Sequence, residues 1–432
     1  MDANIENNSN FAKIKFRTGM CIIKYDVVII GGGAAGMAAS VLAAGSSLRT
    51  ALIEKNGQCG RKLLLTGKGR CNITNTRPWE EFKEHIHPDP AFFRPAFMAF
   101  SNTDTVAMLN SLGLPTVVER GQRVFPLSGR SADVRDALVR RINSAQNIRV
   151  YYDSEAVSVL RAPAGHFVVE VLHSGQRLEM LEIVAGSVII ATGGLSYPAT
   201  GSTGSGYRIA GRLGHTVTVT TPSLTALVPY GYNFALAGLT LRNVSLSLVI
   251  DGGVVQSEFG ELSFTKDGIE GALGFRVSRR AVKALEAGQK VEVAIDLKPA
   301  VTQAELKARV EREYRPGISS ARFLERFLPL QAVRPFLEAV PDVTVQSLPV
   351  RLKCWKFQIK DYVDYRRAVV TAGGVSLKEV SRKTMESKLV PGLYFAGEVL
   401  DLDADTGGYN LQIAFSTAAA AIRNVISRST LQ

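Results

Sequence analysis

Cysteine and histidine are scarce in this sequence, which has 4 cysteines and 5 histidines among 432 residues. The cysteines are Cys21, Cys59, Cys71 and Cys354. Their spacing is neither the C-x-x-C nor the C-x-x-x-x-C of a zinc site or a dithiol redox pair. The close histidine pair, His85 and His87, has no acids or cysteines in a plausible ligand pattern, so we interpret it as part of a loop. We therefore expect no metal site and a reducing, cytoplasmic environment.

Long apolar runs are also lacking. Glycines interrupt the runs at 27–30 and 187–192, and neither reaches the length of a membrane span. Residues 1–20 are polar and mixed in charge, and they contain no apolar core followed by a small-residue cleavage site. We predict that they form a flexible extension and not a signal peptide, and that the protein makes no contact with a membrane.

Continuous basic segments are missing too, although the formal net charge is +12. The lysines and arginines are scattered, without the interleaved aromatic residues of a nucleic-acid platform. This pattern favours an anionic cofactor and an ordinary basic surface over a nucleic-acid partner.

Glycine, in contrast, occurs at the positions that a dinucleotide-binding turn requires. The spacing predicts a βαβ unit at residues 25–54. Gly31 permits a sharp turn, Gly33 lets a pyrophosphate approach the backbone, and Gly36 lets the helix lie close to the strand. The pyrophosphate would bind at the helix N-terminus, and Glu54 would accept hydrogen bonds from a ribose. This unit alone does not distinguish NAD from FAD.

The segments that follow extend the predicted nucleotide site. Residues 57–75 form a glycine-rich basic stretch that we expect to cross the same cofactor. Residues 187–194 read as a buried parallel strand whose C-terminal end points at the cofactor. An edge strand at 156–159 would face the adenine with its backbone, which makes Val157 a candidate contact.

Several helices and strands are predicted by periodicity. Helices are expected at 104–112, at 131–142 with Ser131 as N-cap, at 302–340 from Thr302 and Glu305, and at 411–426. Strands are expected at 122–126, 150–160, 165–172, 216–221, 244–250, 291–295, 369–375 and 392–397.

The C-terminal segment favours FAD over NAD. Glycines at 407–408 lead into the N-terminus of a second helix, and Glu398 directly follows a buried strand. FAD needs one helix start for its pyrophosphate and another whose positive end stabilises the reduced ring. No second G-x-G-x-x-G occurs between Thr192 and Thr371, so NAD(P)H would bind without its own βαβ unit.

Motifs at 54–75, 191–204, 371–375, 384–388, 397–398 and 407–412 resemble the BaiN/YhiN-like flavoproteins, which include aminoacetone oxidase. These belong to the glutathione-reductase-like FAD superfamily. The resemblance covers nearly the whole chain after about residue 24. It implies an α/β fold whose FAD-binding Rossmann domain is split in sequence, with an inserted β-barrel-like domain that carries a helical subdomain.

The resemblance also implies boundaries and contacts. The expected parts are a flexible extension at 1–24, an FAD-binding domain at 25–195 and 366–432, a β-rich domain at 196–300 and 341–365, and a helical subdomain at 301–340. The implied FAD contacts are Gly31, Gly33, Ala35, Gly36, Glu54, Lys55, Lys62, Arg70, Cys71, Asn72, Thr192, Gly193, Gly397, Glu398, Asn410, Leu411 and Gln412.

Two stretches depart from the family's usual pattern. Lys266, Glu270 and Ala272 replace the usual histidine, serine and proline, and residues 413–416 replace an aromatic-rich sequence. Both stretches are expected on the substrate side. Lys266 and Glu270 would either bind a polar substrate or form an exposed ion pair.

We hypothesise an FAD-dependent oxidoreductase that transfers a hydride between flavin and a small organic substrate, with NAD(P)H or dioxygen as second substrate. The alternatives are a flavin-binding RNA-associated factor and a non-catalytic redox sensor. No side chain is assigned as catalytic. Tyr197 and Tyr409 would either line the flavin ring or simply pack, and Cys71 is better explained by packing than by redox exchange.

Overall fold

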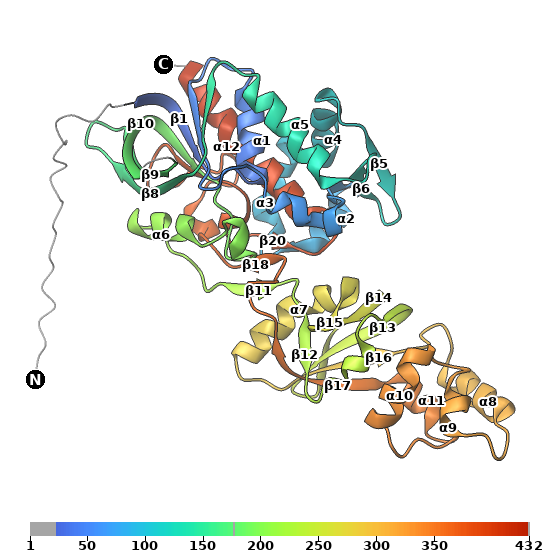
Figure 1. The fold of residues 1–432 in the computed structure, drawn as a ribbon. Coiled ribbons are helices and arrows are strands. Elements are labelled where there is room, and N and C mark those ends of the chain that lie inside the picture. Colours follow the sequence, from blue (N-terminus) through green and yellow to red (C-terminus); the bar gives the residue numbers. More distant parts are fainter. Residues whose placement is uncertain (1–22, 176–177, 431–432) are drawn as a thin grey trace, which may run out of the picture.

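The computed structural model describes residues 23–175 and 178–430, and the predicted extension at 1–24 falls almost entirely outside them. Two hydrophobic cores organise the described chain. One lies around a mixed sheet built from both ends of the sequence, and the other fills a barrel and the helices beside it (Figure 1). The predicted fold class, a Rossmann-type α/β domain with an inserted β-barrel, is confirmed.

The central sheet has seven strands, in the order β7-β2-β1-β10-β9-β8, with β19 also paired to β10. Its strands are β1 (Ile23–Ile30), β2 (Thr50–Ile53), β7 (Ile148–Tyr151), β8 (Ser154–Arg161), β9 (Phe167–Ser174), β10 (Leu178–Ile190) and β19 (Leu393–Phe395). The long β10 pairs antiparallel with β9 through its first half, and parallel with β1 and β19 toward its end. The parallel ends of β1, β2, β10 and β19 therefore meet at one edge, where α/β folds bind ligands.

Helices cover this sheet and the smaller sheets beside it (Figure 1). They are α1 (Ala34–Ala43), α2 (Trp79–Phe82), α3 (Pro90–Ala99), α4 (Asn102–Ser111), α5 (Ser131–Asn143), α6 (Ser205–Arg212) and α12 (Tyr409–Thr430). Short strands form two further sheets, β3-β6-β5 from Thr74–Asn75, Arg123–Pro126 and Thr116–Glu119, and β20-β4 from Asp403–Ala404 and Ile86–His87. Helix α12 is rich in alanine and almost wholly buried along its first four turns, so it packs closely on α1.

The inserted module is a closed barrel of order β12-β15-β14-β13-β16-β17. Its strands are β12 (Leu227–Pro229), β13 (Thr240–Ile250), β14 (Gly253–Thr265), β15 (Gly268–Glu270), β16 (Val291–Asp296) and β17 (Trp355–Tyr362). Its helices are α7 (Gly271–Glu286), α8 (Gln303–Glu313), α9 (Ser320–Leu324), α10 (Leu330–Ala339) and α11 (Leu348–Lys353). Figure 1 shows α7 on the side nearest the nucleotide-binding part and α8 to α11 at the far end.

Two antiparallel strands connect the parts. Strand β11 (Thr221–Ser223) carries the chain toward the barrel and β18 (Val370–Ala372) brings it back, with Thr221 opposite Ala372. The chain thus enters and leaves the barrel module at neighbouring positions (Figure 1). The predicted domain boundaries stay a prediction.

Most predicted elements are present, but several need correction, among them the helical block expected at 302–340, which is three separate helices, α8, α9 and α10. Ser131 is the first residue of α5 and not its N-cap, because Arg130 holds that position and the Ser131 hydroxyl donates to the Leu64 carbonyl. The predicted strand at 216–221 begins only at Thr221, since Val217 makes no more than an isolated bridge to Val375. Helix α7 was not predicted, although Leu273, Val277 and Ala281 are buried at helical spacing along it.

Candidate functional site

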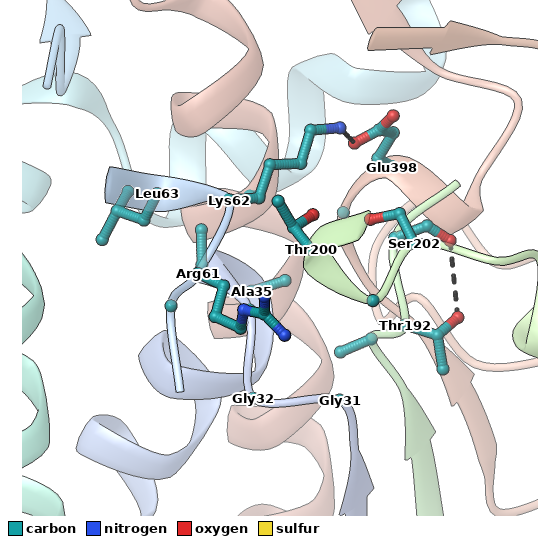
Figure 2. Close-up of a pocket in the computed structure, with 18 of the residues that line it drawn as sticks. Gly31, Gly32, Ala35, Arg61, Lys62, Leu63, Thr192, Thr200, Ser202 and Glu398 are labelled. Atoms are coloured by element: carbon teal, nitrogen blue, oxygen red, sulfur yellow. Dashed lines mark hydrogen bonds and ion pairs between the residues drawn. The ribbon is translucent and has the colours of Figure 1, made fainter. Parts of the chain in front are cut away.

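A cavity opens where the parallel strands of the central sheet end, and both ends of the chain contribute to it (Figure 2). Its walls come from the glycine turn after β1, the residues after β2, the basic stretch at 60–66, the end of β10, and the segments 396–398 and 410–414. These lie at the carboxyl edge of the sheet, as the switch point of a nucleotide-binding fold requires.

The three glycines of the first turn have separate geometric roles. Gly31 has φ +104, and a Cβ there would lie 2.6 Å from the Ala191 carbonyl oxygen. A Cβ on Gly36 would lie 1.8 Å from the Gly31 oxygen, so only glycine allows α1 to approach β1 this closely. A Cβ on Gly33 would meet no atom within 4 Å. The N-terminus of α1 therefore faces open space, which suits an anionic group.

Glu54 is buried at the end of β2 and is already oriented by the backbone. Its carboxylate accepts hydrogen bonds from the backbone N–H groups of Gly32 and Asn56, each at 2.8 Å. The Asn56 side chain donates to the same carboxylate at 2.5 Å. These contacts fix the Glu54 carboxylate at the cavity wall. There the hydroxyl groups of a diol could replace one of its present hydrogen-bond donors.

An ion pair between distant parts of the chain closes another side of the cavity (Figure 2). Lys62 Nζ lies 2.7 Å from Glu398 Oε2 and 2.5 Å from Ser196 Oγ. Glu398 Oε1 accepts from the Ser196 hydroxyl at 2.6 Å and from the Thr371 backbone N–H at 2.9 Å. Both charged side chains are about three-quarters buried, since 24% and 20% of their surfaces are exposed.

A second helix start faces the cavity from the C-terminal segment. Asn410 and Leu411, in the first turn of α12, line it. Glycine is required just before this helix, because a Cβ on Gly408 would lie 2.5 Å from the backbone of Thr74. Two helix N-termini therefore meet one cavity, and both favour negative charge.

The residues expected to bind the cofactor divide into two sets. Those that line the cavity are Gly31, Gly33, Ala35, Glu54, Lys55, Lys62, Thr192, Gly193, Gly397, Glu398, Asn410 and Leu411. Those that lie outside its lining are Gly36, Arg70, Cys71, Asn72, Val157 and Gln412. The cofactor role of each residue stays a prediction.

Local contacts explain why residues of the second group lie outside the cavity lining. Arg70 pairs with Glu119 and stacks over the Phe125 ring at 4.5 Å. Gln412 is fully buried and donates to Phe100 and Ser416. The neighbours Glu155 and Ala156, and not Val157, line the cavity.

Cys71 is buried, and burial raises the pKa of its thiol to about 12. A thiol held protonated at neutral pH is a poor nucleophile. The packing interpretation of Cys71 is therefore the better one.

The aromatic and charged candidates mostly pack. Tyr409 is buried, with its ring stacked on His85 at 4.3 Å, and does not line the cavity. Tyr197 is partly buried and has φ +53. Glu270 accepts a hydrogen bond from Thr265 at the start of α7.

The histidine pair was wrongly interpreted as lacking an acid. Asp405, more than three hundred residues along the chain, accepts from His85 at 2.9 Å and from His87 at 3.2 Å. The two histidines belong to strand β4 and the residue before it, not to an open loop. In the ranges 23–175 and 178–430, no group of three or more His, Cys, Asp or Glu is placed to hold a metal ion.

Sequence reasoning missed other lining residues, namely Asn56, Thr66, Thr200, Gly201, Ser202, Val369, Val370 and Leu402. Of these, Thr200 to Ser202 stand in the T-G-S-T-G-S-G stretch that marks a turn, which is a usable signal. Val369, Val370 and Leu402 are ordinary apolar residues and carry no such signal.

Comparison with known proteins identifies the family. The HI0933-like protein Rossmann domain matches residues 25–424. A 3-dehydro-bile acid delta(4,6)-reductase of Clostridium scindens is 32% identical over 93% of this chain and 98% of its own. A ribosomal RNA dihydrouridine synthase of Escherichia coli is also 32% identical, over 94% of this chain and 98% of its own.

Solved structures confirm the fold. The 3-ketosteroid delta1-dehydrogenase of Sterolibacterium denitrificans superposes with a TM-score of 0.53 at 12% identity, covering 94% of this chain and 100% of that one. Escherichia coli quinol fumarate reductase FrdA superposes with a TM-score of 0.51 at 15% identity, covering 95% and 71%. At such low identity these likenesses show the fold alone.

No helix in the described part of the chain is long and apolar enough to cross a membrane.

The family match spans most of the sequence, and the curated relatives align over nearly their whole length. The chain therefore belongs to the HI0933-like family of Rossmann proteins, and its sequence-based assignment as a BaiN/YhiN-like flavoprotein oxidoreductase is confirmed.

Proposed function

We propose that this protein binds FAD and uses it to reduce a carbon–carbon double bond conjugated to a carbonyl group. The observation that carries the proposal is the cavity itself, which takes one helix N-terminus from α1 and another from α12. In an extended dinucleotide, one helix N-terminus would bind the pyrophosphate and the other would stabilise negative charge on the electron-accepting ring.

The proposed cofactor is supported by the shape and chemistry of the cavity. Open space in front of Gly33 leaves room for a pyrophosphate, and Glu54 is held at the end of β2 for a ribose. Bound FAD would supply the hydride equivalent, and Lys62, held between Glu398 and Ser196, would keep a fixed positive charge at the cavity wall.

The proposed reaction type rests on what the relatives' names have in common. A delta(4,6)-reductase saturates a double bond of a steroid, and a dihydrouridine synthase saturates the double bond of uracil. Both bonds are conjugated to a carbonyl, so a hydride adds to the carbon of the double bond farther from the carbonyl and a proton adds to the nearer carbon of the same bond. NAD(P)H would then return electrons, or dioxygen would remove them in the absence of substrate.

The cofactor is tested by isolation. Purified protein should be yellow, and denaturation should release a flavin that chromatography identifies as FAD. Colourless protein that cannot be reconstituted with FAD would contradict the proposal.

The reaction is tested by reoxidation of the flavin. Protein photoreduced without oxygen is mixed with a 4-en-3-one or 4,6-dien-3-one steroid, and with the matching saturated ketone as control. Return of the oxidised flavin spectrum with the unsaturated ketone alone, together with the mass of a product gaining two hydrogens, is expected. Equal, slow reoxidation by both ketones would oppose the proposed reaction.

A second candidate substrate is a uridine within RNA. The Escherichia coli relative is named for that reaction, and exposed basic residues stand in the stretch 61–70 and on the β5–β6 hairpin that pairs with Arg70, namely Arg61, Lys68, Arg70, Arg120 and Arg123. RNA binding should then weaken steeply with added salt as counterions are released. Absence of RNA retention at low salt would remove this candidate. A cytoplasmic location remains a prediction in either case.

A further inference from the structure

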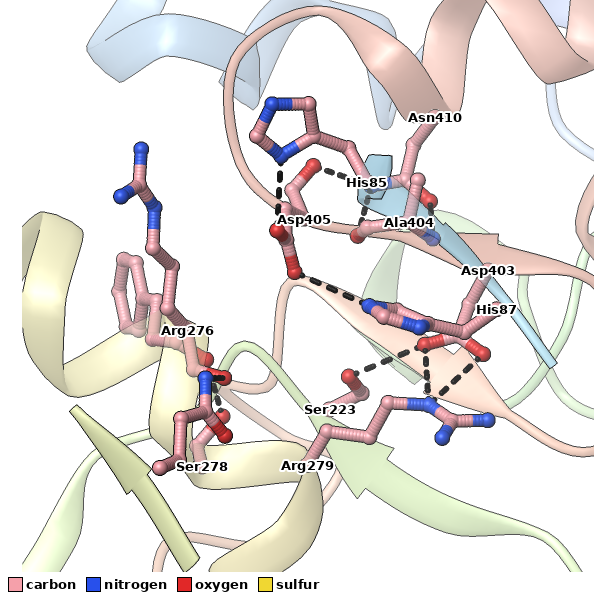
Figure 3. A network of polar contacts seen from close by, with 12 residues as sticks. His85, His87, Ser223, Arg276, Ser278, Arg279, Asp403, Ala404, Asp405 and Asn410 are labelled. Carbon is pink, nitrogen blue, oxygen red and sulfur yellow. Dashed lines mark hydrogen bonds and ion pairs between the residues drawn. The ribbon is translucent and has the colours of Figure 1, made fainter. Parts of the chain in front are cut away.

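A buried ion pair joins the barrel module to the nucleotide-binding part (Figure 3). Arg279, on α7, places its Nε 3.1 Å and 3.0 Å from the two carboxylate oxygens of Asp403, in β20. The exposed fractions of the side chains are 15% for Arg279 and 1% for Asp403. Ser223, on the connecting strand β11, donates to the same carboxylate at 3.3 Å.

Direct contacts lead from Asp403 to the cavity. Its neighbour Ala404 donates its backbone N–H to the Asn410 side chain at 2.9 Å and accepts from it at 2.7 Å. Asn410 stands in the first turn of α12 and lines the cavity with Leu411. The segment 403–410 is thus held at one end by Arg279 and at the other by the start of α12 (Figure 3).

The opposite face of this segment is anchored within the nucleotide-binding part. Strand β20 pairs with β4, and Asp405 accepts hydrogen bonds from both His85 and His87. Arg279 is therefore a contact that ties this anchored segment to the barrel module through a charged, buried pair.

Because this ion pair is buried, losing either of its charges would be costly. Burial raises the pKa of the Asp403 carboxyl, and the attraction of Arg279 works against that rise. A buried carboxylate without its cation is strongly disfavoured. Loss of Arg279 would therefore drive Asp403 to move toward solvent or to take up a proton, and either response disturbs the backbone at 403–404.

We propose that Arg279 is a positioning residue for the cofactor site, acting through Asp403 on the segment 403–410 and the start of α12. The proposal rests on the proposed binding of FAD. The barrel would carry the substrate. Through this contact, a shift of the barrel would move the helix N-terminus that faces the cofactor.

The test uses the full-length protein loaded with FAD. The variants are Arg279→Met, Arg279→Lys, the double variant Arg279→Met with Asp403→Asn, and the control Arg280→Met. Arg280 is the adjacent residue of α7, but it is exposed and donates to the Val255 carbonyl within the barrel module. The measurements are FAD affinity, flavin absorbance spectrum, midpoint potential of the flavin and thermal unfolding of the apoprotein.

For Arg279→Met we expect FAD affinity to fall by at least about fivefold, the lower end of coupling between linked sites, with a shifted spectrum and potential. Lysine at 279 should restore part of this loss, since it keeps the charge. The double variant should restore more, because it removes the buried charge, and Arg280→Met should match the wild type. Where Arg279→Met fails to fold, Arg279→Lys carries the comparison.

An Arg279→Met protein with wild-type affinity, spectrum and potential would overturn the proposal, even if its unfolding temperature were lower. Equal effects of Arg279→Met and Arg280→Met would overturn it too. Wild-type protein that binds no FAD would instead contradict the proposed cofactor, which separates the two failures.

Discussion

The ammonium group of Lys62 lies 2.7 Å from the carboxylate of Glu398, although 336 residues separate them in the sequence. The pair joins the stretch that follows β2 to the segment that directly follows β19. It therefore fastens the N-terminal and C-terminal segments of the nucleotide-binding part across the cavity that both of them line.

Replacing Lys62 with methionine should weaken FAD binding about tenfold. The partly buried Glu398 would lose its cation and keep only Ser196 and the Thr371 N–H as donors, a loss of roughly 1–2 kcal/mol. Titration of apoprotein with FAD measures the effect. Lys68→Met, at an exposed position of the same stretch, is the control and should bind as the wild type does.

Gly33→Ala and Gly36→Ala should fail in different ways. The Gly33 site has open space for a methyl group, so the variant should fold normally but bind FAD poorly, because the methyl occupies the approach of the pyrophosphate. At Gly36 the methyl would strike the Gly31 oxygen, so unfolding should occur more easily by at least about 2–3 kcal/mol. Urea unfolding of the apoproteins separates the two outcomes. Equal stability of both variants would contradict this assignment.

Cys59 and Cys71 should resist alkylation in the native protein near pH 8. Burial raises the pKa of each thiol to about 12, so almost no thiolate forms. Since the folded pKa exceeds the unfolded value, their contribution to stability is complete below the unfolded pKa and declines as pH rises toward 12. Peptide mass spectrometry after iodoacetamide treatment, with and without urea, measures the labelling. Rapid native labelling of Cys71 would revive its redox role.

Asp405→Asn should lower the free energy of unfolding by about 1–3 kcal/mol at pH 7. Burial raises the pKa of Asp405, but hydrogen bonds from His85 and His87 more than offset it, and the resulting pKa is below the usual value. A depressed carboxyl pKa gives stability that is present above the unfolded pKa and is lost as pH falls through the folded one. Urea unfolding between neutral and acidic pH should therefore show a smaller acid loss in the variant. An unchanged acid dependence would contradict the role of this triad.

What the sequence predicted well depends on local pattern. The βαβ unit follows from glycine spacing beside an apolar strand, and the start of α8 follows from a capping box in which Thr302 and Glu305 bond each other's backbone N–H groups. Both patterns are complete within a few residues. The strand at 123–126 and the helix at 409–430 were found for the same reason.

The contacts that the sequence did not reveal join distant residues. The sequence around His85 did not point to Asp405, and that around Arg279 did not point to Asp403, because only the folded chain brings these side chains together. Arg70, a cofactor contact implied by the family resemblance, pairs with Glu119 and stacks on Phe125, both on the β5–β6 hairpin, and so lies outside the cavity lining. Local composition cannot report such competition among partners.

Strands β11 and β18 lie side by side, with Ser223 opposite Val370. The barrel module is therefore inserted between two points that a short turn could bridge, in the manner of inserted domains that tolerate removal or exchange. A protein engineer could therefore graft a different module between β11 and β18, provided that the new module also presents a cation to Asp403 as Arg279 does.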